Sequence, residues 1–407
     1  MLGILLLNIV SFALHSGAYF MPAFSLVSSS DYLIWAGVEI FAEGAMRSLF
    51  SMLFGAGVAL FADTGKTAAV HYRRNFWLLV IGLIDAFVLL WSGDILVNYA
   101  LAGFVLYFVR NVRASRLLTA AVILLVLLSA MYALMHLGMS QLRDVASDVA
   151  TSGLEPTMQQ QEMISQWEAF KETQDPSPET IAAELEERRA GVLSAYRWHA
   201  QTFLALLGFA LPVIMFWDAL VMMLLGMALY RYGVLKGEQS RGFFVKLSVL
   251  GFAVGIAVNA TEVYRAYTSG FELLSTFPYL QWTYHLGRLG VALGWLGLIV
   301  ALLKLRSLQE VTSRLAAVGR MALTNYLMQS LIGLILFTGV GFGWVGQFSR
   351  SEIYGFVLAI WVFQLWYSPL WLARYRFGPV EWLWRGLTYG RFPSNRRVTN
   401  GVGNRSA

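Results

Sequence analysis

The chain alternates between long apolar runs and short polar breaks over most of its length. We predict ten membrane spans, because a helix of roughly 20 apolar residues crosses a bilayer. The runs are continuous rather than alternating in polarity, which favours helices over the strands of a barrel. The predicted spans are 1–20, 33–61, 72–91, 94–110, 117–138, 202–230, 243–264, 279–303, 319–339 and 353–373.

Segment 140–200 interrupts this pattern, because it is highly charged and lacks a long apolar run. The stretch EPTMQQQEMISQWEAFKETQ predicts one amphipathic helix. Pro178 after Ser177 predicts the start of a second helix with a serine N-cap. We expect a small external helical cap, which serves either as a solvated spacer or as a lid over a site.

The composition supports an all-α, polytopic membrane bundle. Hydrophobic residues make up 57% of the 407 residues and charged residues 13%, against about 25% charged residues in a soluble domain. The chain has no cysteine, which excludes disulfides, thiolate catalysis and cysteine metal sites. No metal site is predicted. The predicted domains are transmembrane helices 1–5 (1–139), the external helical loop (140–200), transmembrane helices 6–10 (201–374), and a cytoplasmic amphipathic segment with a disordered basic tail (375–407).

The basic residues predict how the chain is oriented in the membrane. One set of short loops, with the C-terminal tail, holds 21 Lys/Arg, whereas the alternate short loops hold only Arg265 and Arg350. The positive-inside rule places the basic set, and both termini, in the cytoplasm and segment 140–200 outside. This rule also accounts for the net charge of +6, so no nucleic-acid partner is expected.

Charged side chains inside spans are costly and indicate function by default. Glu39, Glu43 and Arg47 recur every four residues and are predicted to share one helical face. Glu43 and Arg47 then form either part of a site or an internal pair that fixes packing.

A second polar group is predicted around an external turn. Trp91 and Asp94 flank the turn WSGD, where Asp94 is suited to cap the next helix. Asp85 lies in the apolar run FWLLVIGLIDAFVLLW. We expect Asp85 either to meet a base from another helix or to stay protonated.

The eighth span carries His285 and Arg288 on one face. A histidine within a span is suited to proton transfer near neutral pH, or it forms one hydrogen bond to a neighbouring helix. His15 lies near the external end of the first span and is expected to be interfacial.

The stretch GRMALTNYLMQS opens the ninth span with a ladder of polar groups. Arg320 marks its cytoplasmic end, and Asn325, Tyr326 and Gln329 lie one to two turns deeper. These groups are expected to point into the bundle, where they either hold helices together or line a cavity. We predict that they floor one outward-facing cavity shared with the polar groups above.

Five stretches together resemble the YeiB-type family of bacterial membrane proteins, which carries a domain-of-unknown-function label (family 418). They are GRMALTNYLMQS, WSGDILVNYAL, SMLFGAGVALF, LGILLLNIVSF and GPVEWLWRGLTYG. The resemblance implies a multi-pass protein of the bacterial inner membrane. Members of that family have a basic lead before the first span, which is absent here. We therefore expect that the natural start lies upstream or that this chain is shortened.

The family is distantly similar to transmembrane acyltransferases such as heparan-alpha-glucosaminide N-acetyltransferase. This similarity implies transfer of an acyl group, with acyl-CoA as the expected donor, to an extracytoplasmic sugar, lipid or metabolite. Asn8 matches a functional asparagine of those enzymes in position, and Tyr19 stands where they have a catalytic histidine.

Under this hypothesis His285 or His15 is the catalytic base, oriented by Asp94 or Glu43. The substrate-binding residues are then Asn8, Arg47, Asp85, Trp91, Arg288, Asn325, Tyr326 and Gln329, and Arg320 contacts the donor. The alternatives are a proton-coupled transporter through the same charged groups, and a non-catalytic scaffold or sensor. The sequence sets neither the substrate nor the oligomeric state.

The orientation is directly testable, because the chain has no cysteine of its own. We expect a Ser165→Cys variant to react with a membrane-impermeant thiol reagent in intact cells. A cysteine at Ser313, in a predicted cytoplasmic loop, serves as the control and should react only after lysis. Labelling of Ser165→Cys only after lysis would reverse the predicted topology.

Overall fold

The computed structural model describes residues 1–305 and 309–397, and the regular structure in these ranges is helical apart from one isolated bridge between Tyr375 and Arg396. This confirms the all-α prediction. The predicted disordered tail falls largely on residues 398–407, outside the described residues. The α-helices are α1 (Leu2–Ala13), α2 (Ser29–Phe41), α3 (Ala45–Asp63), α4 (Ala68–Phe87), α5 (Leu96–Leu106), α6 (Ala114–Ser152), α7 (Met158–Gln174), α8 (Pro178–Arg189), α9 (Val192–Ala205), α10 (Phe216–Arg231), α11 (Arg241–Thr268), α12 (Leu273–Thr276), α13 (Tyr284–Leu303), α14 (Gln309–Arg320), α15 (Ala322–Phe337), α16 (Arg350–Arg374) and α17 (Pro379–Tyr389). Between them lie the 3₁₀ segments η1 (Ser16–Tyr19), η2 (Ala23–Ser25), η3 (Tyr107–Val109) and η5 (Pro278–Leu280), and the π-helical η4 (Leu206–Met215).

The chain is a multi-pass helical membrane protein. Among the described residues, 6 helices are long and apolar enough to cross a bilayer, or up to 7 if the bent pair α14–α15 is one span. Each of the ten predicted spans contains a helix. Two of these helices are shorter than a full span, α1 with 12 residues and α5 with 11. α4 has 20 residues but carries three charged side chains, Arg73, Arg74 and Asp85.

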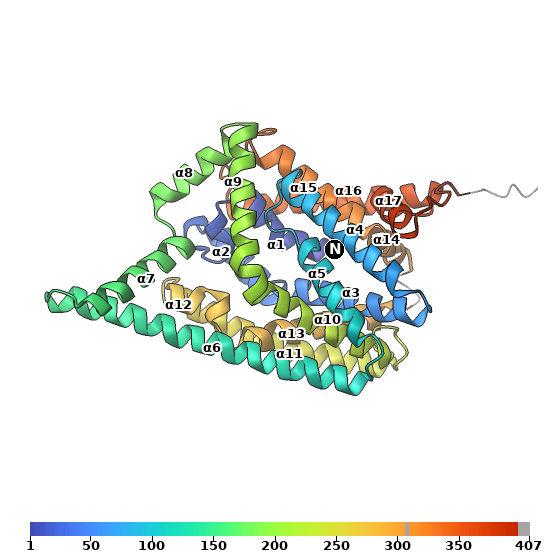
Figure 1. Ribbon diagram of the computed structural model, residues 1–407, viewed down its shortest axis with the longest axis horizontal. Coiled ribbons are helices and arrows are strands. Elements are labelled where there is room, and N and C mark those ends of the chain that lie inside the picture. Colours follow the sequence, from blue (N-terminus) through green and yellow to red (C-terminus); the bar gives the residue numbers. More distant parts are fainter. Residues whose placement is uncertain (306–308, 398–407) are drawn as a thin grey trace, which may run out of the picture.

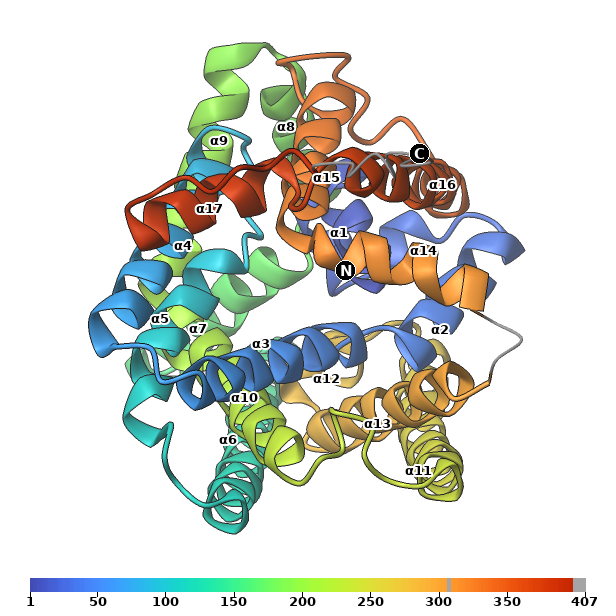
Figure 2. The ribbon, with the colours of Figure 1, turned by 90° about the vertical axis from the view of Figure 1, so that its right-hand side faces the viewer.

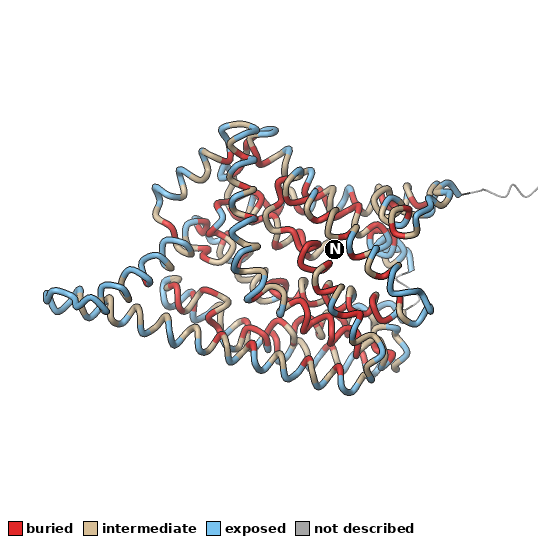
Figure 3. Tube along the Cα trace, viewed as in Figure 1, coloured by how far each residue is buried: buried red, intermediate tan, exposed pale blue. Residues whose placement is uncertain are grey.

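The segment between the sixth and ninth helices is helical, as its sequence predicts. α6 runs 39 residues to Ser152, well past the predicted end of the fifth span at 138, and turns back into α7. The α6–α7 hairpin projects from the bundle and is largely exposed (Figures 1 and 3). Pro178 begins α8, and the Ser177 hydroxyl accepts the backbone N–H of Thr180 at 3.2 Å, which confirms the predicted start and cap.

A buried arginine fixes α8 on the end of α1. The Arg188 guanidinium donates to the backbone oxygens of Leu14 (2.7 Å), Ser11 (3.0 Å) and Phe12 (3.0 Å), and it pairs with Glu184 at 3.0 Å. These oxygens lie in the last turn of α1 and just beyond it, where a helix leaves carbonyls without intrahelical partners. Burial lowers the pKa of Arg188, and Glu184 opposes this shift. Within segment 140–200, α8 is therefore docked on the bundle rather than tethered as a free spacer, whereas the α6–α7 hairpin projects from it.

The basic segments gather at the end of the bundle opposite the α6–α7 hairpin. In Figure 1 the connections α3–α4, α10–α11 and the helices α14 and α17 lie on this side. Figure 2 looks directly at this end, with α17 crossing in front of α4. Such one-sided clustering is what the positive-inside rule requires; which side faces the cytoplasm remains a prediction.

The opening of α15 is stabilised from α17. α14 and α15 meet at a bend of 76° around Met321, which frees the first backbone N–H groups of α15. The Glu381 carboxylate accepts from the N–H groups of Leu323 (2.7 Å) and Thr324 (3.0 Å), and from the Thr324 hydroxyl. A carboxylate at a helix N-terminus accepts hydrogen bonds from the free backbone N–H groups, and its negative charge interacts favourably with the helix dipole. This contact connects two of the stretches that carry the family resemblance.

We expect Glu381→Ala to lower the free energy of unfolding by about 1–2 kcal/mol, the usual cost of losing a helix cap. Thermal unfolding of the purified protein in detergent measures this loss. Glu310→Ala is the control, because that carboxylate is 84% exposed and, among the described residues, forms its one ion pair with the exposed Arg314. Equal midpoints for both variants would show that Glu381 does not stabilise α15.

Candidate functional site

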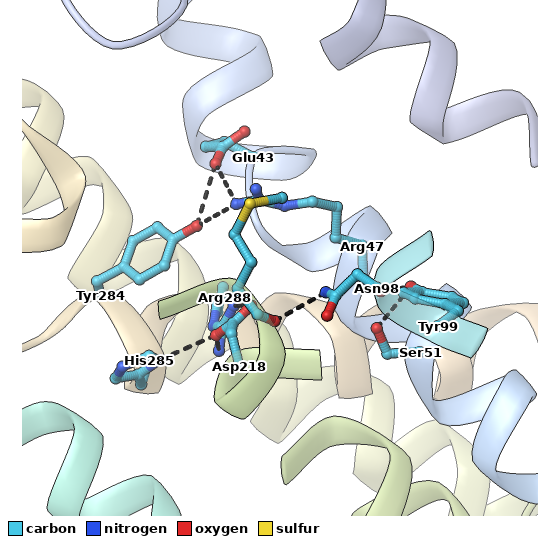
Figure 4. Close-up of polar contacts among 10 residues, drawn as sticks. Glu43, Arg47, Ser51, Asn98, Tyr99, Asp218, Tyr284, His285 and Arg288 are labelled. Atoms are coloured by element: carbon cyan, nitrogen blue, oxygen red, sulfur yellow. Dashed lines mark hydrogen bonds and ion pairs between the residues drawn. The ribbon is translucent and has the colours of Figure 1, made fainter. Parts of the chain in front are cut away.

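A cluster of charged side chains forms where the first long span is interrupted. α2 ends at Phe41 and α3 begins at Ala45, so the predicted continuous helix over 33–61 is broken at residues 42–44. Glu43 lies in this break and pairs with Arg47 at 2.9 Å, as the sequence predicts. Figure 4 shows this Glu43–Arg47 contact. The Tyr19 hydroxyl donates to Glu43 Oε2 at 2.8 Å. Tyr284 bonds both Arg47 (2.6 Å) and Glu43 (3.1 Å).

The break depends on the glycine at position 44. Gly44 has φ +64°, a conformation that residues with a Cβ rarely adopt. A Cβ there would also lie 2.9 Å from the Arg288 side chain and 2.9 Å from the Tyr284 hydroxyl. Both the backbone turn and the close approach of α13 therefore require glycine.

A second ion pair lies beside the first. Arg288 of α13 binds both carboxylate oxygens of Asp218 of α10, with Nη1 at 2.7 Å from Oδ2. His285 is fully buried, with Nδ1 3.9 Å from Asp218 Oδ1, and neither of its ring nitrogens has a hydrogen-bond partner among the described residues. Its ring packs on Tyr132 at 4.6 Å between centroids. Figure 4 shows both ion pairs around Tyr284 and Arg288.

A small cavity opens next to the cluster, with a volume of about 40 Å³, enough for a water or a hydroxymethyl-sized group. Its wall combines three carboxylates, amides and hydroxyls with two aromatic rings. The lining residues are Phe20, Trp35, Glu39, Glu43, Asn259, Glu262, Val263, Ala266, Ser275, Thr276, Pro278, Gln281, Tyr284 and Arg288. Glu43, Tyr284 and Arg288 belong to both the cavity and the cluster.

The polar groups around the predicted external turn form a separate cluster. Asp94 caps α5 by accepting the Val97 N–H at 2.8 Å, which confirms the capping prediction. Tyr326 donates to Asp94 at 3.2 Å and accepts from the Trp91 indole at 3.0 Å. Asp85 is fully buried, and neither of its carboxylate oxygens has a hydrogen-bond partner among the described residues. Asp94 therefore does not lie where it would orient His285.

The amides of the ninth span connect helices rather than floor the cavity. Asn325 donates to the Val318 backbone oxygen and to Ser368, both at 3.1 Å, and Gln329 donates to Gln364 at 3.1 Å. Neither amide lines the cavity described above, and Tyr326 of the same span does not line it either. The prediction of one shared cavity is thus wrong: the polar groups divide into three sets, because each finds partners on its nearest helices.

The remaining predicted residues lie apart from the cluster. His15 is buried beside a different cavity, of about 300 Å³, between the docked cap and the ends of α1 and α16. Asn8 is half-buried on α1. Arg320 is exposed as the last residue of α14, at the basic end. Of the residues predicted for the site, Glu43, Arg47, Arg288 and His285 come together.

Three members of the cluster were not among the predicted site residues: Asp218, Tyr284 and Tyr19. Asp218 carries a sequence signal, because it is an isolated acid in the apolar run VIMFWDALVMM. Tyr19 carries only the positional match to the catalytic histidine of the similar acyltransferases. Tyr284 carries no signal, since tyrosine is frequent at membrane interfaces without any role in a site. The resulting cluster has two acids, two arginines and two phenolic donors around a polar cavity. This set can bind a hydroxyl or amine, take up a proton and stabilise negative charge.

Comparison with known proteins places the chain among bacterial relatives. Residues 229–391 match the family described as "Protein of unknown function (DUF418)". The chain is 31% identical to the uncharacterized protein YeiB of Escherichia coli K12 over 389 residues, which cover 95% of this chain and 93% of YeiB. It is 28% identical to the uncharacterized protein YxaH of Bacillus subtilis 168 over 401 residues, covering 95% of this chain and 91% of YxaH.

No solved structure matches the chain. The similarity to YeiB extends across nearly the whole of both chains rather than one shared segment. The match to the family description covers α13 and the α14–α17 region. The chain therefore belongs to the YeiB-type family of membrane proteins, DUF418.

Proposed function

We propose that the protein is an integral membrane acyltransferase that moves an acyl group from a cytoplasmic donor to a hydroxyl or amine of an extracytoplasmic sugar, lipid or metabolite. The observation that supports this most directly is the position of Glu43. Its carboxylate lies on the cavity wall while Tyr19, Tyr284 and Arg47 hold it in place. A base fixed by several partners beside a space for the nucleophile is the arrangement that acyl transfer needs.

Glu43 takes the role of general base in this proposal. The acceptor hydroxyl enters the cavity, gives its proton to Glu43 and attacks the acyl carbonyl carbon, and the donor's thiolate leaves. Arg288 shares the cavity wall, and its positive charge favours the oxyanion that develops on the carbonyl. Tyr19, which stands where the similar acyltransferases have a histidine, donates to the base. His285 is fully buried and absent from the wall, so we assign it no direct contact with the acceptor.

The composition of the wall favours a hydroxylated acceptor. Carboxylates and amides pair with hydroxyl groups, and the Trp35 and Phe20 rings offer apolar faces of the kind that pack against a sugar ring. The cavity is too small for a whole sugar, so it fits one hydroxymethyl arm of a larger acceptor. In the predicted topology the donor enters from the basic end, where Arg320 is exposed.

Proton-coupled transport is the second candidate. Three carboxylates, from Glu39, Glu43 and Glu262, line one cavity inside the bundle, and intramembrane acids are the usual carriers of coupled protons. Under this alternative the cavity binds a small cation, and the Glu43–Arg47 pair opens when Glu43 is protonated.

The two candidates are separated by labelling inverted membrane vesicles with radioactive acetyl-CoA. We expect protein-dependent label in a lipid or glycan fraction, and a loss of about 100-fold or more in Glu43→Gln, the scale of a missing general base. Glu310→Gln, which removes an exposed carboxylate, should label like the wild type.

Equal labelling with and without the protein, or full labelling by Glu43→Gln, would contradict acyl transfer through this site. Proton movement across the vesicle membrane that depends on Glu43 without any label would favour the transporter instead.

A further inference from the structure

A third cavity, which shares no lining residue with the proposed acceptor site, lies at the basic end of the bundle. It has a volume of about 240 Å³ and is lined by the last turns of α3, the first turns of α4 and the helix α17, which crosses α4 (Figure 2). Three cationic side chains line it: Lys66, Arg74 and Arg385. No carboxylate is found among the described residues of its wall.

Aromatic rings hold two of these cations in place. Lys66 Nζ lies 5.1 Å from the centre of the Phe61 ring and 5.0 Å from that of Tyr389, and it donates to the Tyr389 hydroxyl at 2.6 Å. The Arg74 guanidinium carbon lies 4.6 Å from the Trp384 ring and 5.6 Å from the same Phe61 ring. Cation–π contacts orient a cation but leave its charge in place. Two positive charges therefore share one ring and repel each other.

A buried hydroxyl on the same wall has no hydrogen-bond partner within the part of the chain that the structure describes. Thr388 is 2% exposed, lines the cavity, and its Oγ1 forms no hydrogen bond with the described residues. A buried hydroxyl without a partner costs free energy that a bound acceptor atom would recover. Positive charges close together also cost free energy, which a bound anion would recover. Both features are relieved by one ligand that is negative and rich in acceptor oxygens.

We propose that this cavity binds a phosphate group. A phosphate carries the negative charge that would balance Lys66, Arg74 and Arg385. Its oxygens accept hydrogen bonds from ammonium, guanidinium and hydroxyl groups alike. The cavity is smaller than the roughly 300–1,000 Å³ of a pocket that encloses a whole small molecule. It therefore holds the phosphate end of a ligand whose remainder projects outward. That ligand is either a soluble phosphate ester or an anionic lipid at the membrane surface.

The wild-type measurement distinguishes the two sources. The full-length protein is purified in dodecyl maltoside, which contains no phosphate, and titrated by calorimetry with inorganic pyrophosphate. In a parallel arm the protein is titrated with phosphatidylglycerol in mixed micelles, and its unfolding temperature is recorded. Saturable binding of pyrophosphate assigns a soluble ligand, and a response to phosphatidylglycerol alone assigns a lipid.

The variants test whether the cavity is the site. We expect Arg74→Gln and Lys66→Gln each to weaken binding of the responding probe by about tenfold or more, the scale of a hydrogen bond between charged groups. Lys246→Gln is the matched control, because it removes one exposed positive charge from the basic end without touching the cavity. Thr388→Val keeps all three charges and nearly the same shape, and it should weaken binding several-fold with an unchanged unfolding temperature.

The proposal is overturned if neither probe binds, or if Lys246→Gln weakens binding as much as Arg74→Gln. It is also overturned if Thr388→Val and both charge variants lower the unfolding temperature while binding stays intact, because the contacts would then only hold α17 in place. None of these measurements uses acyl transfer, so the result is independent of the proposed function.

Discussion

Charge neutralisation in the interior determines how the centre of this bundle is built. Each ion buried away from water costs several kcal/mol unless an opposite charge and further hydrogen bonds compensate. Glu43 with Arg47 and Asp218 with Arg288 meet this demand in two adjacent pairs. The pairs come from α2–α3, α10 and α13, so the same contacts that neutralise charge also fix four helix segments relative to one another.

The breaks in the helices follow from this demand. In a continuous helix through residues 42–44, the Glu43 side chain would stay on the surface of that helix. The turn at Gly44 instead brings Glu43 to Tyr284 and lets α13 approach closely. The bend at Met321 has a similar effect at the basic end, where Glu381 satisfies the N–H groups that the bend exposes. Irregular backbone inside a membrane protein is tolerated only where protein groups satisfy it, and both breaks meet that condition.

The sequence predicted what depends on neighbours along the chain. Helix class, the cap at Ser177, the capping role of Asp94 and the Glu43–Arg47 pair all follow from spacings of a few residues. The partner of Arg288 could not be predicted, because Asp218 lies 70 residues away on another helix. The prediction of a single shared cavity failed for the same reason. Asn325, Gln329 and Tyr326 had acceptable partners on several helices, and only the packing decides which of them is nearest.

One helix connects the charged cluster with the cavity at the basic end. α3 begins beside the cluster and carries Phe61, which lines that cavity, in its last turn. The 14 residues from Arg47 to Phe61 correspond to about 21 Å of helix. Both positions lie on one helix, so α3 keeps this separation. Gly55 and Gly226 let its backbone pack directly against that of α10: a Cβ on either would lie 2.0 Å from a backbone oxygen of the other helix. If the proposed acyl donor binds by a phosphate at the basic end, its acyl group has to extend along the bundle to reach the charged cluster, because α3 holds the two sites apart.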